Sequence, residues 1–218
     1  MSMFCRPSVA WLHALPRRRA PSFLSAPPQD VQELERFPEI VLRVGTEVHR
    51  IHSAKRGAWY FNSEDTWRFS PRGVSGLGAC YLADSPVAGL LETYKGVSVV
   101  EEQDVAGKAH FTAALEGDIR LADCCARAAG EHGVNGEIHT TTDYDLTQSW
   151  AAALAQAGFM GIRYFCRSDP AMSLIASAFF GAAGEARAGD WPLGHGRPIS
   201  EGVLREAEDY GLRVRPTP

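Results

Sequence analysis

The sequence lacks several features that mark common classes of protein. No apolar run approaches the roughly 20 residues that a membrane-spanning helix requires. The 5 cysteines are an odd number and form no CxxC pair, so neither a disulfide framework nor a thiolate zinc site is indicated. Basic charge is not in excess, because 22 Lys and Arg residues face 26 Asp and Glu residues. Direct nucleic-acid binding, which depends on neutralising phosphates, is therefore disfavoured. We expect a cytoplasmic protein with no membrane segment.

Familiar catalytic signatures are missing as well. No serine lies in a GxSxG turn, so a serine hydrolase is weakly supported. The glycine cluster "GVSGLGAC" at residues 73–80 precedes a predicted strand, whereas the glycine turn of a dinucleotide-binding Rossmann unit follows one. His49 and His52 are three residues apart on a predicted strand, where an odd offset directs side chains to opposite faces. We predict no metal site.

The chain is long enough, at 218 residues with 45% hydrophobic content, to bury a substantial core. Residues 1–29 contain several prolines and the basic cluster Arg17–Arg19, a mixture that resists a regular packed element. The beginning of the chain reads poorly as a secretory signal, because its basic cluster follows its apolar segment. We predict an N-terminal arm or linker over 1–29 and one domain over 30–218.

Predicted strands outnumber predicted helices and do not alternate with them regularly, which favours an α+β domain over a doubly wound parallel sheet. Alternating and short apolar runs predict strands, and three-and-four spacing predicts helices. The strands are expected at 39–45, 47–53, 79–83, 97–103, 108–115, 118–123, 161–167 and 172–181. The helices are expected at 29–38, 86–94, 124–133, 146–158 and 200–211.

The segment "ACYLADSPVAGLLETYKG" at residues 79–96 joins a strand directly to a helix. Ser85 and Pro86 supply a cap and a proline in the first helical turn. The helix has an apolar face made by Val87, Leu90, Leu91 and Tyr94, and Glu92 stands at the border of that face. A carboxylate there is either an ordinary solvated residue or one held at the edge of a cleft.

Two arginines lie in apolar or aromatic surroundings. Arg50 follows a histidine and precedes an isoleucine on a predicted core strand, and Arg68 lies in "DTWRFSP" between two aromatic residues. A guanidinium at the lip of a pocket offers a planar fork for phosphate oxygens. The alternative for each is a structural ion pair with a carboxylate.

Four segments in order resemble a known family: "HR" at 49–50, "RFSP" at 68–71, "YLADSPVAGLLE" at 81–92 and "TQSWAAALAQAGFMGIRY" at 147–164. The chain resembles the RES domain, the toxin component of bacterial RES-Xre toxin-antitoxin systems, from residue 43 to about 180. The resemblance implies a fold similar to that of ADP-ribosyltransferases, an α+β fold with a split β core and flanking helices around an NAD cleft. Family members degrade NAD at the nicotinamide bond, so it implies an NAD+ glycohydrolase or an NAD+ phosphorylase.

The resemblance also implies roles for particular residues. Glu92 and Tyr81 match the catalytic glutamate and tyrosine, and Arg50 and Arg68 match the arginines that bind NAD. A family serine falls at Asp145, which leaves Thr147 or Ser149 as substitutes, and we include Ser149 among the NAD-binding candidates. His49 and Ile51 depart from the family's pattern around the first arginine, so we expect part of its ring-stacking wall to be missing or to be replaced by Trp59 or Tyr60.

Breaking the nicotinamide bond builds positive charge on the anomeric carbon, which a nearby carboxylate stabilises. We expect Glu92 to do this, and because nicotinamide leaves as a neutral molecule, no general acid is required. NAD is the substrate and no further cofactor is expected. From the sequence, Glu92→Ala should leave folding intact and lower NAD consumption at least about a hundredfold.

Two alternatives stay open from the sequence. An ADP-ribosyltransferase that modifies a protein would use the same NAD site, and a catalytically silent module would only dock a partner. The resemblance further implies a cognate Xre-type antitoxin, which would carry any DNA contact. Whether the chain forms a homo-oligomer is left open.

Overall fold

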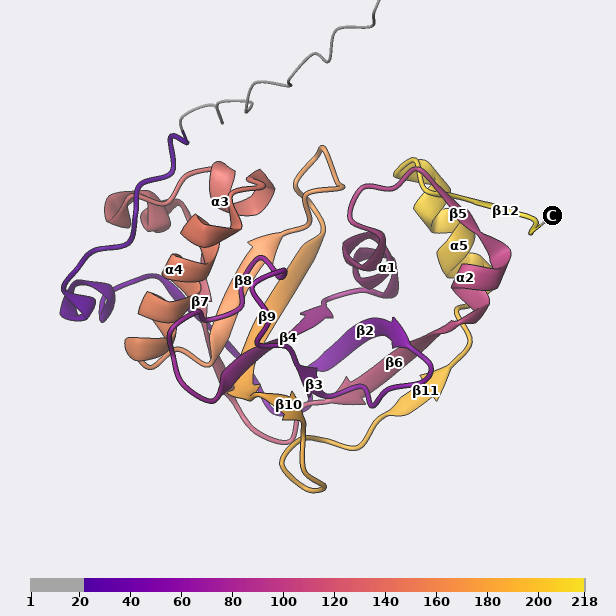
Figure 1. Cartoon of the computed structure of the whole chain (residues 1–218), viewed down its shortest axis with the longest axis horizontal. Coiled ribbons are helices and arrows are strands. Elements are labelled where there is room, and N and C mark those ends of the chain that lie inside the picture. Colours follow the sequence, from indigo (N-terminus) through magenta and orange to yellow (C-terminus); the bar gives the residue numbers. More distant parts are fainter. Residues whose placement is uncertain (1–21, 218) are drawn as a thin grey trace, which may run out of the picture.

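The computed structural model describes residues 22–217, and its largest element is an eight-stranded mixed sheet (Figure 1). The strands lie in the order β1-β7-β8-β9-β4-β2-β6-β11, and β7 and β8 are the parallel neighbours. In the same order, their bounds are Glu39–Leu42, Ile119–Asp123, Gly161–Phe165, Ile175–Ala182, Leu77–Ala83, Glu47–Ser53, Lys108–Ala114 and His195–Arg197.

Two small two-stranded sheets and a few short helices complete the fold. Strand β10 (Gly184–Glu185) pairs with β3 (Tyr60–Phe61), and β12 (Arg213–Arg215) pairs with β5 (Val99–Glu101). The helical elements are η1 (Val31–Leu34), α1 (Pro86–Tyr94), α2 (Glu102–Ala106), η2 (Arg127–His132), α3 (Glu137–Thr140), α4 (Tyr144–Gln156) and α5 (Glu201–Asp209). The α+β class predicted from the sequence is confirmed.

The large sheet is split near its middle. Strands β4 and β9 share seven paired positions, as do β2 and β6. Strands β2 and β4, which join the two halves, share one pair, His49 with Ala83. Beyond that pair the two strands separate, and α1 lies over the seam and contacts both of them (Figure 1). The split β core expected from the resemblance is therefore present.

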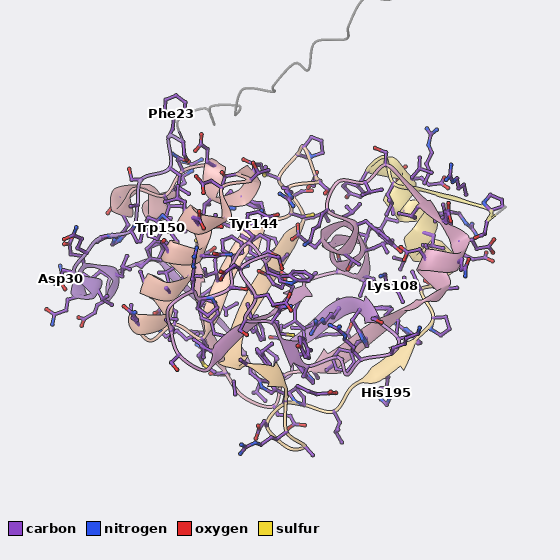
Figure 2. The ribbon with its side chains drawn as sticks, viewed as in Figure 1. Phe23, Asp30, Lys108, Tyr144, Trp150 and His195 are labelled. Atoms are coloured by element: carbon purple, nitrogen blue, oxygen red, sulfur yellow. The ribbon has the colours of Figure 1, made fainter. Side chains whose placement is uncertain are left out.

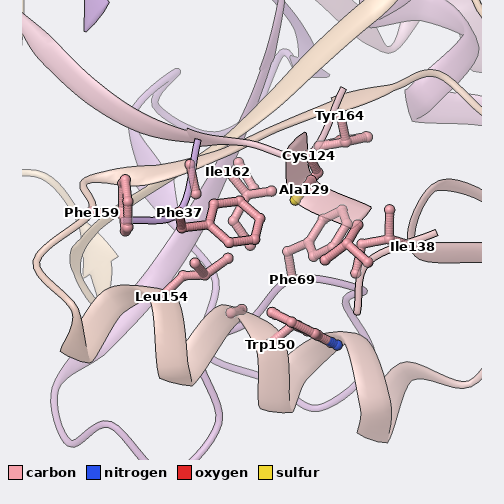
Figure 3. Packing of buried hydrophobic residues seen from close by; sticks show 14 of the residues in the cluster. Phe37, Phe69, Cys124, Ala129, Ile138, Trp150, Leu154, Phe159, Ile162 and Tyr164 are labelled. Atoms are coloured by element: carbon pink, nitrogen blue, oxygen red, sulfur yellow. The ribbon is translucent and has the colours of Figure 1, made fainter. Parts of the chain in front are cut away.

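The main core lies between the sheet and α4 (Figure 3). Trp150 and Leu154, one turn apart on α4, are fully buried against Phe69 and Ile162. The aromatic rings of Phe37 and Phe159 meet edge to face at 6.2 Å between centroids. A second cluster covers the opposite face of the sheet around Phe61 and Phe179, and a third joins α1 to α5. This packing fixes the elements that surround the seam.

Two predicted elements differ from the structure for local reasons. The stretch predicted as one strand over 97–103 divides into β5 and the short helix α2, whose first turn carries Glu102 and Asp104. Acidic residues are stabilising at a helix N-terminus. The helix predicted over 29–38 is a single 3-10 turn, capped by Asp30, because Pro38 prevents its extension.

The N-terminal segment packs earlier than predicted. Leu24 is buried, and the Trp150 indole donates to the Ser25 carbonyl at 2.8 Å. The Glu137 carboxylate accepts from the backbone of Phe23 and Leu24. Contacts with the domain are thus present within residues 22–25, although most of residues 22–29 are exposed. Most of the predicted arm lies outside the described residues. Within 22–217, none of the helices has the length and apolar character needed to span a bilayer.

Candidate active site

A cleft of about 380 Å³ opens where the sheet splits. Its walls come from β2, β3, β4 and α1, from the loop between β3 and β4, and from Tyr144 and Arg167. In Figure 2, Tyr144 is labelled on the α4 side and Lys108 on the β6 side. Four of the five residues predicted from the sequence line this one cleft: Arg50, Arg68, Tyr81 and Glu92.

Glu92 is placed by the helix that the sequence predicts. The Ser85 side chain caps α1, Pro86 occupies its first turn, and Val87, Leu90, Leu91 and Tyr94 are all buried. Because those residues fix the rotation of α1, Glu92 emerges beside the core with its side chain 15% exposed. Its Oε2 atom accepts hydrogen bonds from Arg68 Nη2 at 3.2 Å and from Tyr164 Oη at 2.9 Å.

Arg68 is buried, with 5% of its side chain exposed. Its Nη1 donates to the His139 carbonyl, and its guanidinium lies over the rings of Phe69 and Tyr164, at 4.9 and 4.7 Å from their centroids. Burial alone would lower the pKa of Arg68, but the negative charge of Glu92 counteracts burial, and the net pKa is raised. Arg68 therefore carries a permanent charge that is paired with the Glu92 carboxylate, which corresponds to the ion-pair alternative that the sequence left open.

Tyr81 stands on β4 with its hydroxyl accepting from the Phe69 amide at 2.8 Å. Its ring is tilted against that of Trp67, at 5.6 Å between centroids. Burial raises the pKa of Tyr81, so the phenol is neutral at physiological pH. Tyr81 thus offers a fixed aromatic face, together with Trp67, on the floor of the cleft.

Arg50 lies across the seam on β2. Its Nη1 donates to the carbonyls of Ala58 and Tyr60 and to the Cys80 sulfur at 2.6 Å. These bonds all involve one nitrogen of the guanidinium, and the residue remains partly exposed where it lines the cleft. The arrangement holds the positive charge of Arg50 at the cleft wall.

The cleft is strongly cationic although the chain as a whole is acidic. Its lining has one carboxylate, Glu92, against six Lys and Arg side chains: Arg50, Arg56, Arg68, Lys95, Lys108 and Arg167. The ammonium of Lys95 lies 3.9 Å from the centroid of the Trp67 ring, and Arg167 donates to the Tyr144 hydroxyl at 3.1 Å. Such a hollow raises the local concentration of an anionic ligand.

Ser149 does not line the cleft. It is exposed on α4, where its hydroxyl donates to the Asp145 carbonyl at 2.8 Å. Asp145 is also exposed and pairs with Arg72 at 2.6 Å. Thr147 is buried and donates to the Arg68 carbonyl at 2.6 Å. The structure thus places Ser149 apart from the residues that line the cleft. Of these three positions, Thr147 contacts the site, where it holds the backbone of Arg68.

Several residues that support the site were not predicted from the sequence. Gln148, next to Thr147, donates to the carbonyls of Asp65 and Trp67 and so anchors the loop that carries Arg68. His139 supplies a carbonyl to Arg68, and its imidazole is neutral because burial, followed by the charge of Arg68, lowers its pKa to about 4. Tyr164 stood in the quoted "GIRY" segment, but a strand pattern alone does not reveal which residue its hydroxyl reaches.

Comparisons with known proteins agree with this arrangement. A family model described as the RES domain matches residues 41–193. Among solved structures, the crystal structure of the M. tuberculosis MbcT-MbcA toxin-antitoxin complex is similar, with a TM-score of 0.60 and 18% sequence identity. The match covers 82% of this chain and 96% of that chain. At this identity the likeness shows the fold. Among curated proteins, none matches the chain.

Proposed function

Since the chain belongs to the RES domain family, we propose that it degrades NAD by cleaving the bond between nicotinamide and ribose, with water or inorganic phosphate as the acceptor. The observation that carries the proposal is the charge pattern of the cleft. A single carboxylate, Glu92, stands among six cationic side chains and several aromatic rings. NAD offers a match, because it has an anionic pyrophosphate, two flat bases and one reacting carbon that becomes positive.

The basic side chains and the aromatic rings of the cleft would bind different parts of NAD. Arg50, with the other basic side chains of the wall, would attract and hold the pyrophosphate. Trp67 and Tyr81 would provide surfaces on which a base or the nicotinamide ribose rests. Arg68 would contribute its positive charge while it remains paired with Glu92. The carboxylate would thus be left as the group nearest the reacting carbon.

Glu92 would act on the bond-breaking step. As the C–N bond breaks, its electron pair leaves with nicotinamide, which departs neutral, and positive charge develops on the anomeric carbon. The carboxylate stabilises that charge, and the acceptor oxygen then bonds to the carbon and releases its proton to solvent. No group has to protonate the leaving group, which suits a cleft whose lining contains one acid.

A toxin role and a partner follow from the same proposal. An enzyme that drains cytoplasmic NAD would harm its own cell, so we propose a cognate antitoxin of the Xre type as the protein that restrains it. The similar solved structure is described as a toxin-antitoxin complex. Contact with DNA would belong to that antitoxin.

The reaction can be tested by incubating the purified full chain with NAD, with and without inorganic phosphate, and separating the products by chromatography. We expect nicotinamide together with ADP-ribose in water, or with a phosphorylated ADP-ribose when phosphate is the acceptor. ADP-ribose found by mass spectrometry on a protein would instead favour a transferase. If the chain neither turned over NAD nor bound it in calorimetry, the proposal would be overturned. The chain would then be a module that only binds a partner.

A further inference from the structure

The Glu92 carboxylate is held from two sides through the same oxygen. Arg68 Nη2 and Tyr164 Oη both reach Oε2, at 3.2 and 2.9 Å. The other oxygen, Oε1, receives neither of these bonds. The buried Cys166 thiol is within hydrogen-bonding reach of the carboxylate, and burial and then the charge of Glu92 raise its pKa to about 12, so it stays protonated and adds no second negative charge.

Tyr164 is well suited to hold a carboxylate in place. It is fully buried on β8, and its ring packs against Phe69 at 4.8 Å between centroids. The Arg68 guanidinium covers the same ring. Burial raises the pKa of Tyr164 well above its usual value, so its hydroxyl keeps the proton that it donates to Glu92. The donor is therefore fixed in both position and protonation state.

We propose that Tyr164 is a positioning residue for Glu92: it forms, with Arg68, a clamp that holds Oε2 and fixes the direction in which the carboxylate faces the ligand. The inference rests on the proposed function, since the orientation of the carboxylate matters when a positive charge develops beside it. Without the Tyr164 hydroxyl, the carboxylate is free to turn and use both oxygens on the Arg68 fork, which is the favoured geometry of such pairs. The reacting carbon would then lose its partner.

The first test replaces the hydroxyl alone. Tyr164→Phe keeps the buried ring, so we expect kcat for NAD consumption to fall about tenfold or more, while KM changes less than about threefold, because preorganisation acts mainly in the transition state. Tyr94→Phe is the matched control, since Tyr94 is a buried tyrosine on α1 that does not line the cleft. A Tyr164→Phe enzyme with wild-type kcat would overturn the proposal.

The second test asks whether Tyr164 acts through Glu92. In a Glu92→Gln background there is no carboxylate to position, so adding Tyr164→Phe should change kcat less than about twofold. An equal loss of kcat in the wild-type and Glu92→Gln backgrounds would show that Tyr164 acts independently of Glu92, which would contradict the proposed clamp.

The clamp can also be judged apart from catalysis. In thermal unfolding, the shifts caused by Tyr164→Phe and Glu92→Gln should be non-additive, because the two side chains are in direct contact. If the wild-type chain released no nicotinamide, the proposed function would fail by itself. Coupled melting temperatures would then still support the clamp, and additive ones would reject it.

Discussion

The proposed chemistry depends on single side chains, and their neighbours in the structure differ from those that the sequence suggested. Glu92 was identified from its place at the edge of an apolar helix face, and the structure puts it at 15% exposure against a buried arginine. Arg68 was expected to bind phosphate, yet its two Nη atoms contact Glu92 and the His139 carbonyl. Sequence spacing locates such residues, but the partner of a long side chain comes from distant parts of the chain.

The buried ion pair alters the expected effect of removing Glu92. Glu92→Ala would leave Arg68 charged and without its carboxylate, which should lower the free energy of unfolding by about 3 to 5 kcal/mol. Glu92→Gln retains the shape and an acceptor oxygen, so it should cost clearly less. Urea denaturation of both variants checks this, and two variants of equal, wild-type stability would show that the pair contributes nothing to folding.

Lys95 has two separate roles, one for its backbone at the end of α1 and one for its side chain in the cleft. It caps α1 in the left-handed conformation, with φ 50°, and its ammonium covers Trp67 in the cleft. Lys95→Gly should raise the free energy of unfolding by about 0.5 to 1 kcal/mol, since glycine accepts this conformation without strain. The same change should raise KM for NAD about tenfold through loss of the cation.

Met172 offers the matched control for Lys95. It also has a positive φ, 52°, but it does not line the cleft. Met172→Gly should therefore relieve the backbone without moving KM. If Lys95→Gly left KM unchanged as well, Lys95 would have no part in binding.

Individual elements were the most predictable level of the structure. The strand expected at 47–53 and the helix expected at 86–94 coincide with β2 and α1, because alternation and three-and-four spacing survive in the local sequence. The short strands β10, β11 and β12 were missed, since their two or three residues carry no period and depend on pairing with remote partners. In the loop between β3 and β4, the sequence pointed to Arg68, but it did not show that Trp67 and Asn62 of the same loop also line the cleft.

The loop between β8 and β9 shows how such a segment is held. Asp169 is 1% exposed, and its carboxylate accepts from the amides of Ala171, Ser173 and Leu174 and from the Ser173 hydroxyl. Asp169→Ala should lower the free energy of unfolding by about 1.5 to 3 kcal/mol, because three backbone amides and one hydroxyl would lose their charged acceptor. Chemical denaturation measures this, with the exposed Asp190→Ala as the control. A loss no larger than that of the control would contradict the role given to Asp169.

In the molecule as a whole, the cleft exists because the large sheet is split. The cleft therefore forms only when the chain is folded. Two well-paired halves meet through one residue pair, so the space between them is held open by the packing of α1 and α4 on either side. The family resemblance anticipated this architecture. The excess of cations around one carboxylate became visible only when distant segments were brought together.

Stability should fall in mild acid because two buried histidines are neutral in the folded chain. Burial lowers the pKa of His110 and of His139 to about 4, with nearby positive charges adding to the effect. The unfolded chain takes up these protons near pH 6.5. Between about pH 6.5 and pH 4 it therefore binds more protons than the folded chain, so stability is full above this window and decreases as the pH falls through it.

Removing one of these histidines should flatten the pH dependence. His110→Gln should make the slope of unfolding free energy near pH 5 shallower by about 1 kcal/mol per pH unit. The same substitution at the exposed His195 is the control. Denaturation curves recorded from pH 4 to 8 decide the matter, and parallel slopes for the wild type and His110→Gln would contradict the account.

The role of Glu92 in NAD cleavage is tested by the initial rate of nicotinamide release by the purified full chain, compared with that of Glu92→Gln at equal concentrations of folded protein. We expect turnover by the wild type and a rate at least about a hundredfold lower in the variant. A folded Glu92→Gln chain that releases nicotinamide at the wild-type rate would contradict this role of Glu92.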